Sequence, residues 1–150
     1  MGNDTIDILK SINNNEQDIT MNLNMLKLAY IGDSIYENLI RDYVIHTYTD
    51  KLKMNDIHKI TTSFVCASMQ SKLIDKMLDD SFLNDNEIDI FKSARNCHNI
   101  TKSKNSSIVE YRKATGFEAV LGYLYFKKDF DRLEEIFVWI KRSLQDCAST

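Results

Sequence analysis

Proline is absent from this chain of 150 residues, and glycine occurs only four times. Folds rich in β-strands usually need both residues in their loops, because proline presets turn geometry and glycine adopts backbone angles that other residues avoid. Their scarcity therefore favours an all-α fold. The length is that of one domain, and 43% hydrophobic with 27% charged residues indicates a globular chain rather than a disordered one.

Cysteines are few, and their spacing supports neither a disulfide framework nor a zinc site. Cys66, Cys97 and Cys147 are odd in number, far apart and without a CxxC pair, which is typical of reduced thiols in the cytosol. The N-terminus shows no basic-then-apolar signal pattern, and no apolar run approaches the ~20 residues of a membrane span. We therefore expect a cytoplasmic protein without a membrane partner.

The net charge of −3 does not by itself suggest a nucleic-acid partner. The charge is unevenly distributed, however, because residues 92–113 contain six Lys or Arg side chains against one acid, Glu110. A local basic surface on an acidic protein suits a polyanionic ligand. A basic loop that is merely solvated remains the alternative interpretation.

Hydrophobic periodicity predicts a series of helices within a single domain of residues 22–150, preceded by an arm or short helix over residues 1–21. A capping box, Asn84 with Glu87 three residues later, marks one helix start. Residues 99–107 are polar and aperiodic, which predicts a loop. The predicted helices cover residues 22–48, 55 to beyond 77, 84–97, 108–127 and a last one from about 129.

Two carboxylates stand in unusually apolar surroundings. Asp33 is the only charge between Lys27 and Glu37, and Glu118 is the only charge between residues 113 and 127. Helices this apolar should be largely buried, and an acid there must replace its lost hydration with a partner. No cation lies one helical turn from either acid.

Three explanations are open for these acids. Each could lie on a narrow solvent-facing stripe, pair with a distant arginine, or share a divalent cation. All internal glycines, Gly32, Gly116 and Gly122, fall near the two acids. Because a glycine inside a helix costs roughly 0.5–1 kcal/mol relative to alanine, their positions suggest close helix approach or room beside a ligand.

Two segments around these acids resemble the ribonuclease III family. Residues 28–36, LAYIGDSIY, resemble the signature helix of its catalytic domains, and residues 115–122, TGFEAVLG, resemble its second acidic motif. Arg95-Asn96 and the lead-in at residues 111–115 are similar to the stand-alone variant, Mini-ribonuclease III, which lacks a double-stranded-RNA-binding domain. The likeness spans about residues 22–145.

The resemblance implies a homodimeric, ribonuclease III catalytic-domain-like helical bundle that cleaves double-stranded RNA by Mg²⁺-dependent hydrolysis and leaves 5′-phosphate and 3′-hydroxyl ends. Asp33 and Glu118 would be the catalytic and metal-binding residues. The expected substrate is precursor large-subunit (23S) ribosomal RNA, with a ribosomal protein on that RNA as a further partner. The residues expected to bind RNA are Arg95, Asn96, Lys102, Lys104, Asn105, Arg112 and Lys113.

The chain also departs from the longer enzymes of this family. Two further carboxylates of their cluster are replaced here by Ala29 and Thr115, so we expect weaker metal binding and a higher Mg²⁺ requirement. Glu37 lies one turn beyond Asp33, where we expect a solvated side chain rather than a spare ligand. Since two acids are missing, a non-catalytic dimeric RNA-binding protein on the same fold is the alternative function.

Overall fold

The computed structural model describes residue 6 and residues 24–48, 53–97 and 107–148. These residues form helices and turns, and they contain no strand. The predicted all-α fold is therefore confirmed. No helix among them is both long and apolar enough to span a bilayer. The helices are α2 (Met25–Thr47), α3 (Met54–Val65), α4 (Ala67–Asp79), α5 (Asp85–Arg95), α6 (Ile108–Phe126) and α7 (Phe130–Ala148).

Side-chain caps determine where several helices begin. The Asn24 side chain accepts a hydrogen bond from Lys27 N at 2.9 Å at the start of α2, and Ser107 caps α6 in the same way. The predicted capping box of α5 is confirmed, because Glu87 N donates to Asn84 Oδ1 at 2.9 Å and Asn84 N donates to Glu87 Oε1 at 3.0 Å. Such caps satisfy amides that have no partner within the helix.

One predicted element was wrong, because the helix expected from residue 55 to beyond 77 is interrupted at Cys66. This residue has extended backbone angles (φ −68°, ψ 155°), and it separates α3 from α4. The last carbonyls of α3 are bound by side chains instead of helix amides. Tyr36 Oη donates to Phe64 O at 2.6 Å, and Gln70 Nε2 donates to Val65 O at 2.9 Å. These donors replace the amides that a continuous helix would have supplied.

Most of residues 1–21, and most of the loop predicted over residues 99–107, lie outside the described part of the chain. The exceptions are Ser107 and Ile6, which is helical, buried and part of the main hydrophobic core.

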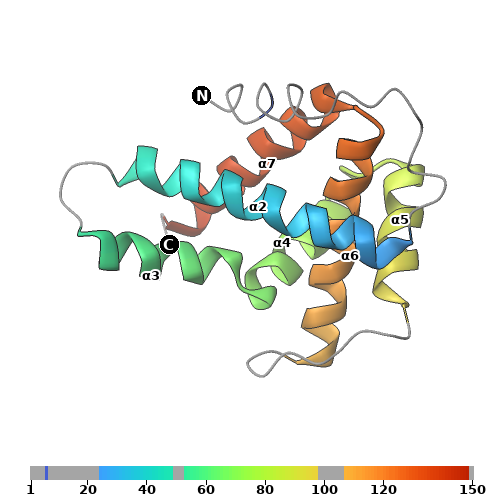
Figure 1. Ribbon diagram of the computed structural model, residues 1–150, viewed down its shortest axis with the longest axis horizontal. Coiled ribbons are helices and arrows are strands. Elements are labelled where there is room, and N and C mark those ends of the chain that lie inside the picture. The colour runs from blue at the N-terminus through green and yellow to red at the C-terminus, as the bar shows by residue number, and fades with distance from the viewer. Residues whose placement is uncertain (1–5, 7–23, 49–52, 98–106, 149–150) are drawn as a thin grey trace.

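The central contact of the fold is between α2 and α6, which cross near the middle of the molecule (Figure 1). Two glycines allow their backbones to touch. A Cβ on Gly32 would overlap the carbonyl oxygen of Glu118, and a Cβ on Gly122 would overlap the carbonyl oxygen of Leu28. The close helix approach suggested by the glycine positions is therefore confirmed.

The remaining helices cover this pair. α7 buries an apolar stripe against the core, formed by residues at three- and four-residue spacing. These are Phe130, Leu133, Phe137, Ile140 and Leu144. A stripe of this kind removes apolar surface from water at roughly 25 cal/mol per Å².

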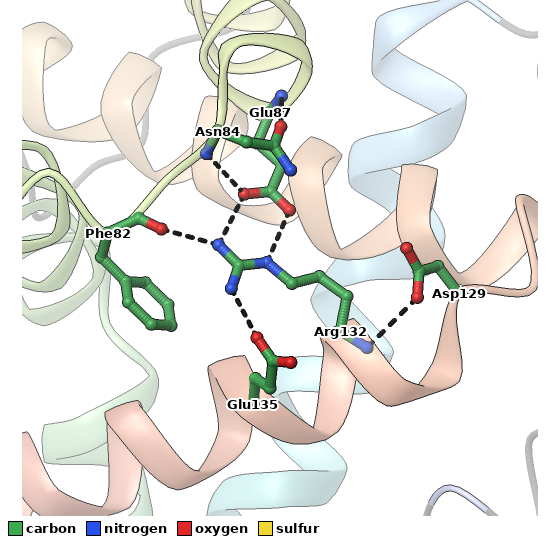
Figure 2. A network of polar contacts seen from close by, with 6 residues as sticks. All are labelled: Phe82, Asn84, Glu87, Asp129, Arg132 and Glu135. Atoms are coloured by element: carbon green, nitrogen blue, oxygen red, sulfur yellow. Dashed lines mark hydrogen bonds and ion pairs between the residues drawn. The ribbon is translucent and has the colours of Figure 1, made fainter.

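A buried ion pair links α5 to α7 (Figure 2). Glu87 is 1% exposed, and its two carboxylate oxygens accept hydrogen bonds of 2.9 Å from Nε and Nη2 of Arg132. Nη2 also donates to the carbonyl oxygen of Phe82 at 2.7 Å, and the guanidinium lies 4.5 Å from the centre of the Phe82 ring. This bidentate arrangement holds the start of α5 against α7.

Candidate active site

Asp33 of α2 and Glu118 of α6 line one cavity of about 270 Å³. The two acids are 85 positions apart in the sequence, and the crossing of their helices brings them together. The other lining residues come from α6, α4 and the end of α3, beside the interruption at residue 66. They are Val65, Ala67, Gln70, Tyr111, Ala114 and Thr115.

The local backbone explains why the acids face the same space. Gly32 directly precedes Asp33, and the peptide carbonyl of Glu118 rests where a Cβ of residue 32 would otherwise lie. The two acidic residues therefore lie at the point where the backbones of α2 and α6 are in contact. A larger residue at position 32 would separate the helices at this point.

Like charge and burial disfavour ionisation of both acids. Asp33 is exposed at the cavity, and its pKa is raised by partial desolvation and by the charge of Glu37. Glu118 is partly buried, and burial first, then the charge of Asp33, raises its pKa to about 8. A hydrogen bond from Gln70 counters only part of this rise. Asp33 is thus the first of the pair to lose its proton.

No basic side chain compensates these acids within the described residues. None of the ion pairs in this part of the chain involves Asp33 or Glu118. The explanation that each acid pairs with a distant arginine is therefore wrong for the described residues. Exposure of Asp33 fits a solvent-facing position, whereas partial burial of Glu118 does not. An acid pair of this kind lacks positive charge, which a cation would provide.

Gln70 is a cavity residue that the sequence analysis did not identify. It is 2% exposed, its Nε2 is bound to Val65 O, and its buried Oε1 has no partner among the described residues. A weak signal was available in the sequence. Position 70 falls in the inward stripe of α4 with Leu73, Ile74 and Met77, so an amide occupied a position that periodicity assigns to the core.

Two residues whose roles were uncertain now have positions. Thr115 lines the cavity, and its hydroxyl donates to Tyr111 O at 3.0 Å. Glu37 does not line it, and forms an exposed ion pair with Arg41 at 2.8 Å. The expectation of a solvated Glu37 is confirmed.

The donor set of the cavity suits a hard divalent cation. Two carboxylates face it, and no third histidine, cysteine, aspartate or glutamate joins them in a metal-binding group within the described ranges. Mg²⁺ is commonly held by one or two carboxylates, with water filling the other positions. The raised pKa of Glu118 also fits, because a cation would favour the ionised form that burial disfavours.

The predicted RNA-binding residues differ in their surroundings. At the end of α5, Arg95 lies 5.3 Å from the centre of the Phe91 ring, and its Nε donates to Asn96 Oδ1 at 3.2 Å. On α6, Arg112 is exposed, whereas Lys113 forms an ion pair with Asp75 at 3.0 Å. Lys102, Lys104 and Asn105 lie outside the described residues.

Comparison with known families and sequences gives consistent matches. Residues 26–129, a range that includes both cavity acids, match the family described as the Ribonuclease III domain. The Mini-ribonuclease 3 of Clostridium tetani is 48% identical over 76% of this chain and 74% of its own length. That of Enterococcus faecalis is 41% identical over 78% of this chain and 87% of its own. That of Staphylococcus aureus is 36% identical over 81% of this chain and 90% of its own length.

A solved structure has a similar fold. The crystal structure of a protein from Fusobacterium nucleatum superposes with a TM-score of 0.68 at 27% sequence identity. The match covers 80% of this chain and 93% of that one.

Proposed function

This chain belongs to the ribonuclease III family, and on that premise we propose that it is an endoribonuclease that cleaves double-stranded RNA. We assign Asp33 and Glu118 as the catalytic residues and as the ligands of Mg²⁺. Hydrolysis of the phosphodiester would leave a 5′-phosphate and a 3′-hydroxyl. The observation that carries the proposal is that these two acids line one cavity without a basic partner in the described part of the chain.

The chain's own residues have distinct tasks in this mechanism. Asp33, which is exposed and is the first of the pair to ionise, would hold the divalent cation together with Glu118. Glu118 is more buried than Asp33 and keeps its proton to a higher pH. It must release this proton before it can act as a metal ligand. A divalent cation bound there would supply Lewis-acid stabilisation of charge on the scissile phosphate. Val65 and Ala67 contribute apolar side chains to the cavity wall.

Positively charged side chains near this cavity would bind the RNA backbone. Duplex RNA is read mainly through phosphates and 2′-hydroxyls across its wide minor groove. Arg112 follows the cavity residue Tyr111 directly and is exposed, which supports a phosphate contact. Arg95 and Asn96 lie at the end of α5, the helix that packs on α6. We retain Lys102, Lys104, Asn105 and Lys113 as further candidates.

We also propose that the active form is a homodimer, in which each subunit cleaves one strand of the duplex. Tyr30 supports this, because it lies within the signature segment of α2 and is 85% exposed. The support from this segment is limited to few residues, because Leu28, Ile35 and Tyr36 are buried within the subunit.

The natural substrate and the compartment are part of the same proposal. We infer precursor 23S ribosomal RNA, presented with a ribosomal protein, as the substrate, and the cytoplasm as the compartment. The free thiols of Cys66 and Cys97 agree with a reducing environment.

The proposal is tested by incubating the purified protein with a structured duplex RNA and Mg²⁺, alongside Asp33→Ala. Cleavage by the wild type that is lost in the variant would support it, as would loss of cleavage on chelation of the metal. Binding without cleavage would instead favour a non-catalytic RNA-binding protein. A half-maximal Mg²⁺ concentration in the micromolar range would contradict the weak metal binding expected from two acids.

A further inference from the structure

The carboxamide of Gln70 has a fixed orientation at the wall of the Asp33–Glu118 cavity. Its nitrogen donates to Val65 O at 2.9 Å, and the amide also forms a hydrogen bond to Glu118 that lowers the pKa of that carboxyl. Because a carbonyl can only accept, the atom facing Val65 must be the NH₂ group, and Oε1 must point elsewhere. The choice between the two ends of the amide is therefore determined by chemistry.

The Oε1 atom is buried without a donor among the described residues. A buried carbonyl oxygen left without a hydrogen bond costs about 1–3 kcal/mol, so such groups are rarely retained without a partner. Gln70 lines the same cavity as Asp33 and Glu118, and this cavity is large enough to hold water. The missing donor can therefore come from a molecule in the cavity.

We propose that Gln70 is a positioning residue whose Oε1 accepts a hydrogen bond from an O–H group bound beside Asp33 and Glu118. The donor is either a water molecule or a ribose 2′-hydroxyl of the RNA. This inference rests on the proposed function for its place in catalysis. Gln70 links that donor to the end of α3 through Val65, so the interruption between α3 and α4 helps to determine where the donor sits.

The test replaces Gln70 with methionine, which keeps the length of the side chain and removes both polar atoms. Loss of one oriented hydrogen bond near the reacting groups should lower kcat about 10- to 100-fold with a smaller effect on KM. Ser71→Ala is the matched control, because Ser71 is the next residue of α4, is also buried, and does not line the cavity. A kcat for Gln70→Met within twofold of the control would overturn the proposal.

Substrate analogues identify the donor. A 2′-fluoro group at the scissile nucleotide cannot donate a hydrogen bond. If the ribose hydroxyl is the donor, this substitution should slow the wild type about tenfold or more and add little in Gln70→Met. If water is the donor, both proteins should be slowed by the same factor. A rise only in the Mg²⁺ concentration needed for half-maximal rate would overturn the proposal, because it would mark Gln70 as a direct metal ligand.

A second measurement does not depend on catalysis or on the folding of a variant. A high-resolution crystal structure of the metal-free wild type should contain an ordered water within hydrogen-bond distance of Gln70 Oε1. An Oε1 bound to a protein donor, such as a protonated Glu118, would overturn the proposal. If the wild type binds RNA without cutting it, the proposed function fails. The crystal structure still tests whether Gln70 Oε1 accepts a hydrogen bond from a molecule in the cavity, because that measurement does not require cleavage.

Discussion

The carbonyl oxygen of Glu118 occupies the space that a Cβ on Gly32 would need, so the two residues are in backbone contact where α2 crosses α6. The neighbour of one acid thus determines the position of the other. The chemistry of the cavity depends on a residue that contributes no side chain to it.

Gly32→Ala should therefore destabilise the protein. An added methyl group at a backbone contact forces the helices apart, and overpacking of this kind costs about 1–3 kcal/mol or more. Urea unfolding monitored by circular dichroism measures the effect. Ser34→Ala is the control, since Ser34 is exposed on the same helix and should change stability by less than about 0.5 kcal/mol. Equal stabilities of the two variants would contradict the contact.

The raised pKa of Glu118 predicts a pH-dependent stability of the metal-free protein. The folded-state pKa is about 8 and the ordinary value is 4.5. Below pH 4.5 the group is protonated in both states and has no effect. Between these values the unfolded chain releases its proton while the folded protein keeps it, so stability falls until about pH 8 and then levels.

Glu118→Gln should remove this loss. The variant should be more stable than the wild type by a few kcal/mol above pH 8, and the difference should disappear toward pH 4. Urea unfolding at a series of pH values, with a chelator present, measures both curves. Added Mg²⁺ should stabilise the wild type and not the variant. Parallel curves at all pH values would show that Glu118 ionises normally.

The Glu87–Arg132 pair predicts a second, unrelated loss of stability (Figure 2). Arg132→Met leaves a buried carboxylate without its bidentate partner, which costs about 3–5 kcal/mol. Arg41→Met is the control, because Arg41 pairs with Glu37 at the surface, where a salt bridge contributes about 0–1 kcal/mol. Thermal unfolding of both variants is the measurement, and similar losses would refute the assigned importance of burial.

Arg112 and Lys113 should contribute unequally to RNA binding. Each phosphate contact that is lost lowers the slope of log Kd against log salt by about one. Arg112→Ala should flatten this slope by that amount. Lys113→Ala should change it less, because Lys113 is already paired with Asp75. Fluorescence anisotropy with an uncleaved duplex measures both slopes. The salt concentration runs from about 50 to 200 mM, because the affinity of a protein with several phosphate contacts falls about 10³-fold or more across this range. Equal slopes would contradict the role of Asp75.

Local signals in the sequence accounted for much of the fold. The capping box at Asn84 and the apolar stripe of α7 are properties of neighbouring residues, so periodicity was sufficient to predict them. The interruption at Cys66 was not predictable in this way. The end of α3 is bound by the hydroxyl of Tyr36, which belongs to a different helix and is distant in the sequence.

The same distinction applies to the site. Asp33 and Glu118 were identifiable because a single acid in an apolar helix is conspicuous in the sequence itself. Gln70 was missed because a neutral amide at an inward-facing helix position is only a weak signal until its surroundings are known. The ion pair of Lys113 with Asp75 spans 38 positions, and no local pattern links them.

The central claim is that Asp33 and Glu118 act as one catalytic unit, and a double-mutant cycle of RNA cleavage tests it most directly. We predict that Asp33→Asn and Glu118→Gln each lower the single-turnover rate on the order of 10³-fold, and that the double variant is no slower than either alone. Glu37→Gln, an acid outside the cavity, should stay within a few-fold of wild type. Losses that multiply in the double variant, or cleavage that survives either substitution, would contradict the account.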